Sequence, residues 1–424
     1  MTRQDPLEVL FSLERLGMKF GLEHIRLLCE ALGHPEQAFR SIVIAGTNGK
    51  GSVTVMVETA LRSAGHRTGR YTSPHLARLE ERFAIDGQHV ETARLRDCVA
   101  VVQTAVESLV ERGVVEGPPT FFECATAAAF ELFRRAHVDI AVLEVGLGGR
   151  LDATNVVTPI ATAITSIDFD HQAQLGDTIE AIAAEKAGII KRGIPVVCGP
   201  LPAAAQTVIT DIAATLAAPV IDAPHEVRIL TPHDDGSIDL RTPARFLERV
   251  TLALAGRHQR DNAAVAVALL DELDRQGIRV TDEAVRAGLT KAEWPGRLER
   301  FRRGGIDILL DAAHNPAGAR ALASHLEAIG WTRVTLVFGA MRDKDVRSML
   351  AALAPFCESI VCTTAPGPRA LSALEIADAA RHLGPAVEAI DDPAAAIDRA
   401  VAIGKPVVAA GSIFLIGPLR DILR

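Results

Sequence analysis

The sequence predicts an α/β protein with two domains, each built on a mostly parallel sheet that helices cover. Apolar runs of strand length, such as residues 41–45 and 138–146, alternate with longer segments of helical periodicity. At 424 residues the chain is too long for one ordinary hydrophobic core. A stretch rich in Pro, Gly and Arg near residue 295 divides the alternation into two parts.

The elements expected in the first part follow from the hydrophobic pattern. Helical spacing occupies the first forty residues, for example at Leu7, Leu10 and Phe11 and again at Ile25 and Leu28. Strands are expected at residues 41–45, 138–146, 159–167 and 194–199, and helices at 50–64, 178–188 and 261–276. Residues 225–255 alternate short polar and apolar stretches around the turn DDGS, which predicts a small antiparallel excursion.

The second part repeats the alternation on a smaller scale. The segment WPGRLERFRRGG, which starts at Trp294, has the composition of a linker, so we place the domain boundary there and expect domains at 1–295 and 296–424. Beyond it, strands are expected at 307–313, 333–340, 359–365, 386–390 and 406–411. This pattern predicts a doubly wound, Rossmann-like sheet.

Composition narrows the classes of partner. Forty-five basic and fifty-three acidic residues give a net charge of −8, which is the wrong sign for a chain that coats nucleic acid or an anionic membrane, so we expect small-molecule partners. No run of eighteen uncharged apolar residues is present, and the N-terminus is charged, which favours a cytoplasmic location. The six cysteines lack CxxC spacing and are expected to be reduced structural thiols.

The residues AGTNGKGS at 45–52 directly follow an expected strand and precede an expected helix. In this arrangement, backbone N–H groups and the helix N-terminus point at one place and can bind phosphate. Lys50 would bring positive charge to the outer phosphates, and Ser52 would offer a hydroxyl to Mg²⁺. Gly51 separates the lysine from the serine, unlike the common pattern. Glycine-rich turns also join strands to helices where no phosphate binds, so the loop alone leaves both interpretations open.

Charged side chains follow three further expected strands, at the edge where open α/β sheets bind ligands. Glu144 ends one strand, and a carboxylate with one or two hydroxyls suits Mg²⁺. Asp170 and His171 end the next strand, and Asp311 and His314 follow the first strand of the second part. A glutamate that caps a strand in solvent explains Glu144 equally simply when it is taken by itself. His171 taken by itself would more simply be a surface or packing residue, as most of the thirteen histidines must be.

Two facing domains with polar strand ends favour a cleft between them. Lys186 lies in an otherwise apolar helical segment, where composition predicts a solvated lysine.

The order and spacing of these motifs resemble one family, the folylpolyglutamate synthase and dihydrofolate synthase enzymes, which are relatives of the Mur ligases. The resemblance runs from GLEHIRLLCEALGHPE through GTNGKGS, SPHLARLEERFAIDG, TFFE and LEVGLGGRLDATN. It continues with DH, LGDTIEAIAAEKAGIIKRG, LAGRHQRDNA, WPGRLE, DAAHNP, FGAMRDKD and GSIFLIG, and so covers nearly the whole chain. In this family a glycine between the lysine and the serine is the usual form of the loop, whereas Mur ligases usually lack it.

The resemblance implies an ATP-dependent amide ligase with a Mur ligase-like fold: an N-terminal P-loop-type ATPase domain and a smaller C-terminal glutamate ligase domain. ATP would phosphorylate the carboxylate of dihydropteroate or of a reduced folate, and the amine of L-glutamate would attack the acyl phosphate. Because two anions must meet, positive charge and a metal have to neutralise them, and a closing cleft has to exclude water. The implied cofactor is Mg²⁺, ATP is the co-substrate, and the family usually works as a monomer.

The same resemblance implies roles for residues of the catalytic centre. The implied catalytic residues are Lys50, Glu144, His171 and Lys186. The implied ATP-binding residues are Thr47, Asn48, Gly49, Lys50, Gly51, Ser52, Asn262, Arg297 and Asp311. Ser52, Ser73, Glu144 and His171 match metal ligands or their close neighbours. Lys186 matches a lysine that is carbamylated in the family, and a carbamate would put an anion near magnesium where an ammonium would be repelled.

Two further sets match the substrate pockets. The implied pterin pocket consists of Phe20, Gly21, Thr120, Phe121, Phe122, Glu123, Leu151, Asp152 and Ala153, in which Phe121 or Phe122 would stack on the ring. His314 and Ser412 match positions near the incoming glutamate.

The sequence leaves alternatives open. A Mur-type ligase acting on a UDP-linked cell-wall precursor uses similar chemistry, although the phosphate loop begins at residue 46 and leaves little room for a uridine domain. A nucleotide-driven switch would hydrolyse ATP without making an amide. Within the family, the chain could make dihydrofolate only, extend glutamate tails only, or do both, and we expect both.

Overall fold

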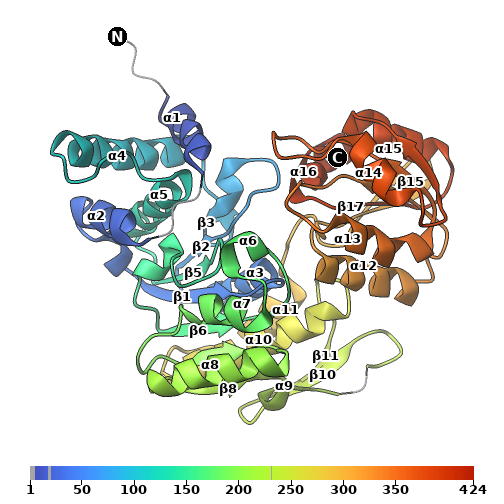
Figure 1. Ribbon diagram of the computed structural model, residues 1–424. Helices are drawn as coiled ribbons and strands as arrows, with labels where there is room; N and C mark the ends of the chain where they lie inside the picture. Colours follow the sequence, from blue (N-terminus) through green and yellow to red (C-terminus); the bar gives the residue numbers. More distant parts are fainter. Residues whose placement is uncertain (1–4, 18–20, 231) are drawn as a thin grey trace.

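The computed structural model describes residues 5–17, 21–230 and 232–424, and the structural statements below refer to these residues. Two large sheets organise them into an N-terminal and a C-terminal lobe, which lie side by side in Figure 1. The predicted pterin residue Phe20 lies outside the described residues.

The N-terminal lobe contains an eight-stranded sheet in the order β4-β3-β2-β5-β1-β6-β7-β8. Its strands are β1 (Arg40–Ala45), β2 (Thr68–Tyr71), β3 (Phe83–Ile85), β4 (Gln88–His89), β5 (Ile140–Glu144), β6 (Ala161–Ile164), β7 (Val196–Cys198) and β8 (Val220–Asp222). All neighbours are parallel except the β2–β3 and β3–β4 pairs. The predicted parallel sheet is therefore confirmed, with an antiparallel extension at one edge.

Helices cover both faces of this sheet because its central strands are apolar on both sides. Ile42 and Ile44 of β1 belong to one core, whereas Val43 and Ala45 belong to the other. The first core is closed by α3 (Lys50–Ser63), α10 (His258–Arg275) and α11 (Asp282–Thr290). The second is closed by α2 (Glu23–Ala31), α4 (Thr92–Glu111), α5 (Phe121–Arg135), α7 (Ile179–Ala187) and α8 (Ala203–Thr215).

Shorter elements complete the lobe. They are α1 (Pro6–Ser12), α6 (Gln172–Leu175), α9 (Ala223–Glu226) and the 3₁₀ turns η1 (Leu13–Leu16), η2 (Pro35–Gln37), η3 (Leu79–Arg82) and η4 (Ala153–Val156). The predicted antiparallel excursion is confirmed as a three-stranded sheet of β9 (Arg228–Ile229), β10 (Ile238–Arg241) and β11 (Phe246–Val250).

The C-terminal lobe contains a six-stranded sheet in the order β12-β13-β17-β14-β15-β16. Its strands are β12 (Glu299–Arg303), β13 (Ile306–Leu310), β14 (Val334–Phe338), β15 (Cys357–Cys362), β16 (Ala386–Ala389) and β17 (Val407–Ala410). One face packs against α12 (Pro316–Ala328), α13 (Val346–Leu353) and α14 (Ala373–Ala380), with η5 (Ala354–Phe356) following α13. The other packs against α15 (Pro393–Ala402) and α16 (Ile413–Leu423). The predicted second sheet is thus confirmed.

Part of the predicted linker is wrong, because Glu299–Arg303 forms strand β12, antiparallel to β13. The turn between the two strands is Gly304–Gly305, and both glycines have positive φ, at 57° and 83°. Two such residues make the tight hairpin turn whose twist matches that of antiparallel strands. Three of the four arginines that gave the segment its linker-like composition, Arg300, Arg302 and Arg303, lie on this edge strand, where polar side chains are tolerated.

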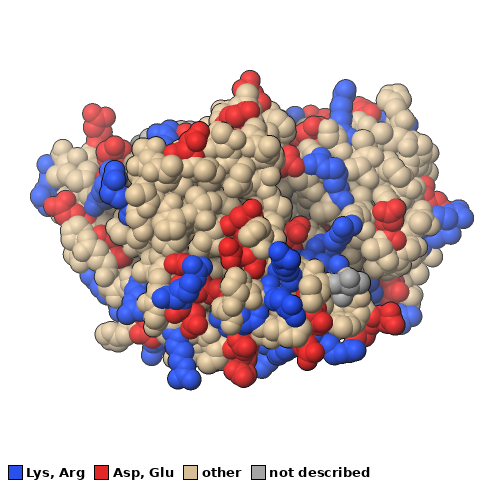
Figure 2. Space-filling view, turned by 90° about the horizontal axis from the view of Figure 1, so that it is seen from below, with Lys and Arg blue, Asp and Glu red and all other residues tan. Residues whose placement is uncertain are grey.

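The structure also shows how the charged side chains and the cysteines are distributed. Figure 2 shows acidic and basic side chains interspersed over the face seen from below. Among the described helices, none has the length and apolarity needed to cross a bilayer. All six cysteines are free thiols, and only Cys357 is more than slightly accessible.

Candidate active site

The phosphate-type loop joins β1 to α3 at the carboxyl edge of the N-terminal sheet. The Thr47 N–H donates to the carbonyl of Ser166 at 2.8 Å, and the Asn48 N–H donates to Oγ of the same serine at 3.0 Å. The loop is therefore fixed against the segment that follows β6. Gly49, which precedes α3, has φ 86°, a left-handed conformation that glycine adopts without strain.

Two lysines converge on one carbonyl of this loop. Nζ of Lys50 donates to the Gly46 oxygen at 3.0 Å, and Nζ of Lys186 donates to the same oxygen at 2.9 Å. Burial lowers the pKa of both amines, and the pKa of Lys186 falls to about 7 because Lys50 also repels its charge. Lys186 is only 5% exposed, so its interpretation as a solvated lysine is wrong.

Glu144 and Ser73 form an oxygen-rich site beside the loop. The Ser73 N–H donates to Oε2 of Glu144 at 3.2 Å, while the buried Oγ of Ser73 has no hydrogen-bond partner. Burial raises the pKa of Glu144, and Lys50 opposes this by favouring the carboxylate. Within the described residues, no group of three or more His, Cys, Asp and Glu side chains could hold a metal alone. A metal that also takes hydroxyl, water and phosphate oxygens, as Mg²⁺ does, fits this donor set.

The predicted nucleotide residues gather around the same loop. Nδ2 of Asn262 donates to Gln259, and Nε2 of Gln259 donates to Oγ of Ser52 at 3.2 Å, so α10 is linked to the first turn of α3. Asp311, at the end of β13, accepts from the N–H groups of Leu298 and Ala313, both at 2.9 Å. Burial raises the pKa of Asp311, and the Arg297 guanidinium opposes that shift. The structure therefore brings Arg297 and Asp311 close together.

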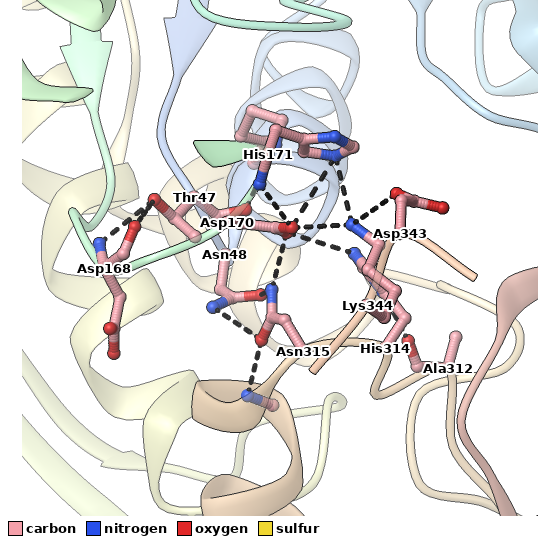
Figure 3. A network of polar contacts seen from close by, with 12 residues as sticks. Thr47, Asn48, Asp168, Asp170, His171, Ala312, His314, Asn315, Asp343 and Lys344 are labelled. Carbon is pink, nitrogen blue, oxygen red and sulfur yellow. Dashed lines mark hydrogen bonds and ion pairs between the residues drawn. The ribbon is translucent and has the colours of Figure 1, made fainter. Parts of the chain in front are cut away.

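Asp170 joins the two lobes. Its carboxylate accepts from Nζ of Lys344 at 2.6 Å and from Nδ2 of Asn315 at 2.9 Å, and Asn315 also donates to Asn48 of the phosphate-type loop (Figure 3). Burial by itself would raise the pKa of Asp170. The opposite effect of Lys344, His171 and His314 is larger, and it holds the pKa of Asp170 well below its usual range. Both partners of the Asp170–Lys344 ion pair are over 90% buried.

Two predicted histidines flank this ion pair. Nε2 of His171 lies 3.2 Å from Nζ of Lys344, and Nε2 of His314 lies 3.9 Å from Asp170. Burial lowers the pKa of His171, and it lowers the pKa of His314 to about 4, so His314 is neutral at pH 7. Nδ1 of His314 lies 2.8 Å from the Ala312 carbonyl, so Nδ1 carries the proton and Nε2 faces the site.

Replacing Asp170 with asparagine is expected to reduce the free energy of unfolding by about 3 kcal/mol, because the Lys344 ammonium would stay buried without its counter-charge. Urea denaturation at pH 7 measures the change. The pKa of Asp170 is lowered in the fold, so this stabilisation is present above its ordinary value of 3.8 and is lost as the pH falls toward the folded value.

The matched control is Asp343→Asn, since Asp343 lies 3.7 Å from the same Nζ but is 39% exposed. Its loss should cost less than about 1 kcal/mol. Equal effects of the two substitutions would contradict the role of the buried pair.

Among the described pterin-pocket residues, residues 120–123 begin α5 and residues 152–153 begin η4, which contacts α5, but several of them are engaged in capping. Thr120 and Glu123 form a capping box at the start of α5. Asp152, which follows Leu151 in sequence, accepts from the N–H groups of Gly146, Leu147 and Thr154 and caps η4, whose first residue is Ala153. The ring of Phe121 stacks on Phe11 at 6.0 Å, and the Arg82 guanidinium lies 5.1 Å from its centroid.

Three further residues of the predicted pterin and glutamate pockets have structural contacts of their own or lie next to a helix. Phe122 packs against Gly146, at whose position a Cβ would lie 2.7 Å from the Phe122 ring. Gly21 has φ 151° and precedes α2. Ser412 is buried and caps α16 by accepting from the Phe414 N–H at 3.2 Å. Of the predicted site residues, Glu144 and Asp311 thus lie at strand ends, whereas Lys186 and Asn262 lie on helices.

The predicted set lacks Lys344, Asn315 and Gln259. Lys344 follows β14 and Asn315 follows β13, so both stand at the carboxyl edge where the predicted residues also lie. That shared position is the signal that could have found them. Gln259 offers no such signal, because it reaches Ser52 from a helix more than two hundred residues away in the chain.

Comparison with known families accounts for both lobes. A model of the Mur ligase middle domain matches residues 44–270, and one of the Mur ligase, glutamate ligase domain matches residues 296–413. The dihydrofolate synthase/folylpolyglutamate synthase of Bacillus subtilis is 36% identical over 418 residues, which is 97% of this chain and 96% of that protein.

Two solved structures share the fold across both lobes. Escherichia coli FolC in complex with DHPP and ADP has a TM-score of 0.88 at 31% identity, covering 99% of this chain and 98% of that one. A bifunctional folylpolyglutamate synthase/dihydrofolate synthase with Mn, AMPPNP and L-glutamate bound has a TM-score of 0.87 at 33% identity, with the same coverage.

The fold and the site together define an ATP-dependent ligase of the Mur type, with a phosphate-type loop on one lobe and a glutamate ligase domain on the other. Full-length similarity at more than 30% identity narrows this further. The chain belongs to the family of dihydrofolate synthase and folylpolyglutamate synthase enzymes.

Proposed function

We propose that this chain uses ATP to join L-glutamate to dihydropteroate and to reduced folates through an acyl phosphate. The observation that carries the proposal is the meeting of the two lobes at Asp170, where Asn48 of the loop and Lys344 of the C-terminal lobe converge. Among the relatives, one structure is a complex with DHPP and ADP, and another has Mn, AMPPNP and L-glutamate bound. A site with both lobes around it suits a reaction that joins a nucleotide, a pterin acid and an amino acid.

The nucleotide is assigned to the phosphate-type loop of the N-terminal lobe. Residues 47–52 would surround its phosphates, which Lys50 and the N–H groups after Asn48 would bind, because the N–H groups of Thr47 and Asn48 already donate to Ser166. Asn262, Arg297 and Asp311 would lie around the nucleoside. The Lys50 amine sits next to Glu144 and Asp170, whose charges favour its protonated form. It would therefore offset the negative charge that builds up when the substrate carboxylate attacks the γ-phosphorus and ADP leaves.

Glutamate is assigned to the C-terminal side, beside His314 and Ser412. Attack of its neutral amine on the acyl carbon forms the amide bond and releases phosphate, and the amine loses one proton. His314 is neutral there, so it adds no charge that would repel an amine. Burial of the Asp170–Lys344 pair excludes water from this junction, which protects an acyl phosphate from hydrolysis. The pterin is assigned to the pocket around α5, next to Phe121 and Phe122.

Ser52, Ser73, Glu144 and His171 would hold Mg²⁺ beside the loop. When bound, the metal would neutralise phosphate charge and orient the transferred group. The unpartnered Oγ of Ser73 next to buried Glu144 is the feature of this chain that fits it. Lys344 already lies at Nε2 of His171, so ligation by His171 would use Nδ1 or require Lys344 to move.

Glu144→Ala is expected to abolish turnover and to weaken Mn²⁺ binding in the presence of ADP by about tenfold, which is ~1.4 kcal/mol. Electron paramagnetic resonance of free Mn²⁺ measures the binding without relying on activity. Glu144→Gln, which keeps the shape and removes the charge, should behave in the same way. Unchanged Mn²⁺ affinity in both variants would contradict the assignment.

The deciding experiment measures ADP release and new amide bonds by mass spectrometry, with dihydropteroate and a reduced folate monoglutamate supplied separately. Both acceptors should gain glutamate, and ADP release should require acceptor and glutamate together. No turnover of dihydropteroate would remove the first activity, and ADP release without product would indicate a nucleotide-driven switch.

Three further assignments stay predictions alongside this function. They are a monomeric state, a cytoplasmic location and a domain boundary between residues 295 and 296.

A further inference from the structure

The extra glycine of the phosphate-type loop lies against a tryptophan. Gly51 is the second residue of α3 and is buried. A Cβ at this position would lie 2.5 Å from Cζ2 of Trp294 and 2.7 Å from Cε2 of the same ring. Both distances are too short for a non-bonded contact between two carbon atoms, so the indole occupies the space that a side chain at residue 51 would need.

The indole is anchored to the N-terminal lobe by a second contact. The Arg70 guanidinium of β2 lies 5.6 Å from the centroid of the Trp294 ring, which is cation–π distance. Arg70 is itself buried, and its Nη1 lies 3.8 Å from Oε2 of Glu58, another residue of α3. The ring therefore contacts α3 directly at Gly51. It also contacts Arg70, which is paired with Glu58 further along the same helix.

The residues after Trp294 connect this contact to the C-terminal lobe. The Gly296 carbonyl accepts from the Ala312 N–H at 2.8 Å, and the Leu298 N–H donates to Asp311 at 2.9 Å. Gly296 also lies close to Leu76 of the N-terminal lobe and Ile416 of α16, since a Cβ there would be 3.1 to 3.2 Å from their methyl groups. The segment 294–298 thus begins against the phosphate-type loop and ends on the strand end of β13.

We propose that Trp294 is a positioning residue for the nucleotide: its indole sets the orientation of the first turn of α3, and residue 51 is glycine because the ring takes the space of a side chain. Through residues 295–298 the same contact couples nucleotide binding to the placement of the C-terminal lobe. This inference rests on the proposed nucleotide site, but it does not depend on which acid is ligated.

A double-mutant cycle on Mg·ADP binding tests the contact, with calorimetry on wild type, Gly51→Ala, Trp294→Ala and the double variant. Gly51→Ala alone should weaken ADP binding by about tenfold, because the new methyl group pushes the first turn of α3 off the ring. In the Trp294→Ala background the same change should cost less than about twofold. An equal loss in both backgrounds would overturn the proposal.

The matched control is Gly288→Ala on α11. A Cβ there would lie 2.6 Å from the Met56 carbonyl and 2.8 Å from Cβ of Ala60, so it presses on α3 away from the loop. Gly288→Ala should lower the thermal midpoint of unfolding. Any change that it causes in ADP affinity should be the same whether residue 294 is tryptophan or alanine. If it couples to Trp294 as Gly51→Ala does, the effect is general destabilisation and the proposal fails. Trp294→Leu replaces Trp294→Ala if the latter does not fold.

A spectroscopic measurement distinguishes positioning from stability. Only two tryptophans are present, so Trp331→Phe leaves Trp294 as the sole indole. The fluorescence of Trp294 should change as ADP is added, and the titration should give the same affinity as calorimetry. No change in fluorescence would overturn the proposal. ADP binding with the expected coupling but without amide formation would defeat the proposed function and leave this inference standing.

Discussion

Lys50→Ala is expected to lower the rate of glutamate addition by about 10²- to 10³-fold while leaving the fold intact. The Lys50 amine donates to the loop carbonyl of Gly46 at 3.0 Å, and although burial lowers its pKa, Glu144 and Asp170 both favour its charge. In the proposed reaction this charge offsets the anion that develops on the transferred phosphoryl group. The rate of ADP release with saturating folate and glutamate measures the loss, and circular dichroism with thermal melting checks the fold.

Lys405→Ala is the control for removing a lysine. Lys405 lies in the C-terminal lobe, is 37% exposed, and pairs with Glu358 at 3.4 Å, away from the loop. Its loss should leave the rate within about twofold of wild type, since exposed ion pairs contribute little. A near wild-type rate for Lys50→Ala would contradict the assignment of the loop as the phosphate site.

The sequence predicted the central strands because they carry continuous apolar runs. The strands at 41–45 and 138–146 are buried on both faces in the structure, so nothing interrupts their pattern. The short strands β2, β3, β4 and β8 were missed, because two to four residues give too little periodicity. The hairpin of β12 and β13 was missed for another reason: its Gly-Gly turn and arginine-rich edge strand share the composition of a linker.

The positions of Glu144 and Asp311 could be predicted because a residue type and a strand end coincide there, while their roles stay predictions. Sequence reasoning does not find residues whose position depends on contacts from distant parts of the chain. The burial of Lys186 results from packing of α7 under the phosphate-type loop, and its own sequence neighbours do not indicate it. Trp294 gave no chemical signal at all, because its partner is a glycine 243 positions earlier.

Lys186 is suited to carbamylation because its amine is neutral at mildly alkaline pH. Burial first, and then the neighbouring Lys50, lower its pKa from 10.5 to about 7, so above pH 7 most of the folded protein carries the free amine. Only this form adds to CO₂: its nitrogen bonds to the carbon, one proton is released to solvent, and a carbamate anion results. The anion would also relieve the repulsion between two ammonium groups at the Gly46 carbonyl.

Activity is therefore expected to fall in CO₂-depleted buffer and to return on addition of bicarbonate, with a larger recovery at pH 8 than at pH 6. Lys186→Ala should lower turnover by about 10²-fold and should not respond to bicarbonate. Lys191→Ala is the matched control, because Lys191 is partly buried and donates to the Asn155 carbonyl, so the bicarbonate response should survive. With ¹³C-labelled bicarbonate, a carbamate resonance should appear in wild type and vanish in Lys186→Ala. If turnover is independent of CO₂ at both pH values and no carbamate resonance appears, the unmodified amine of Lys186 is the active form.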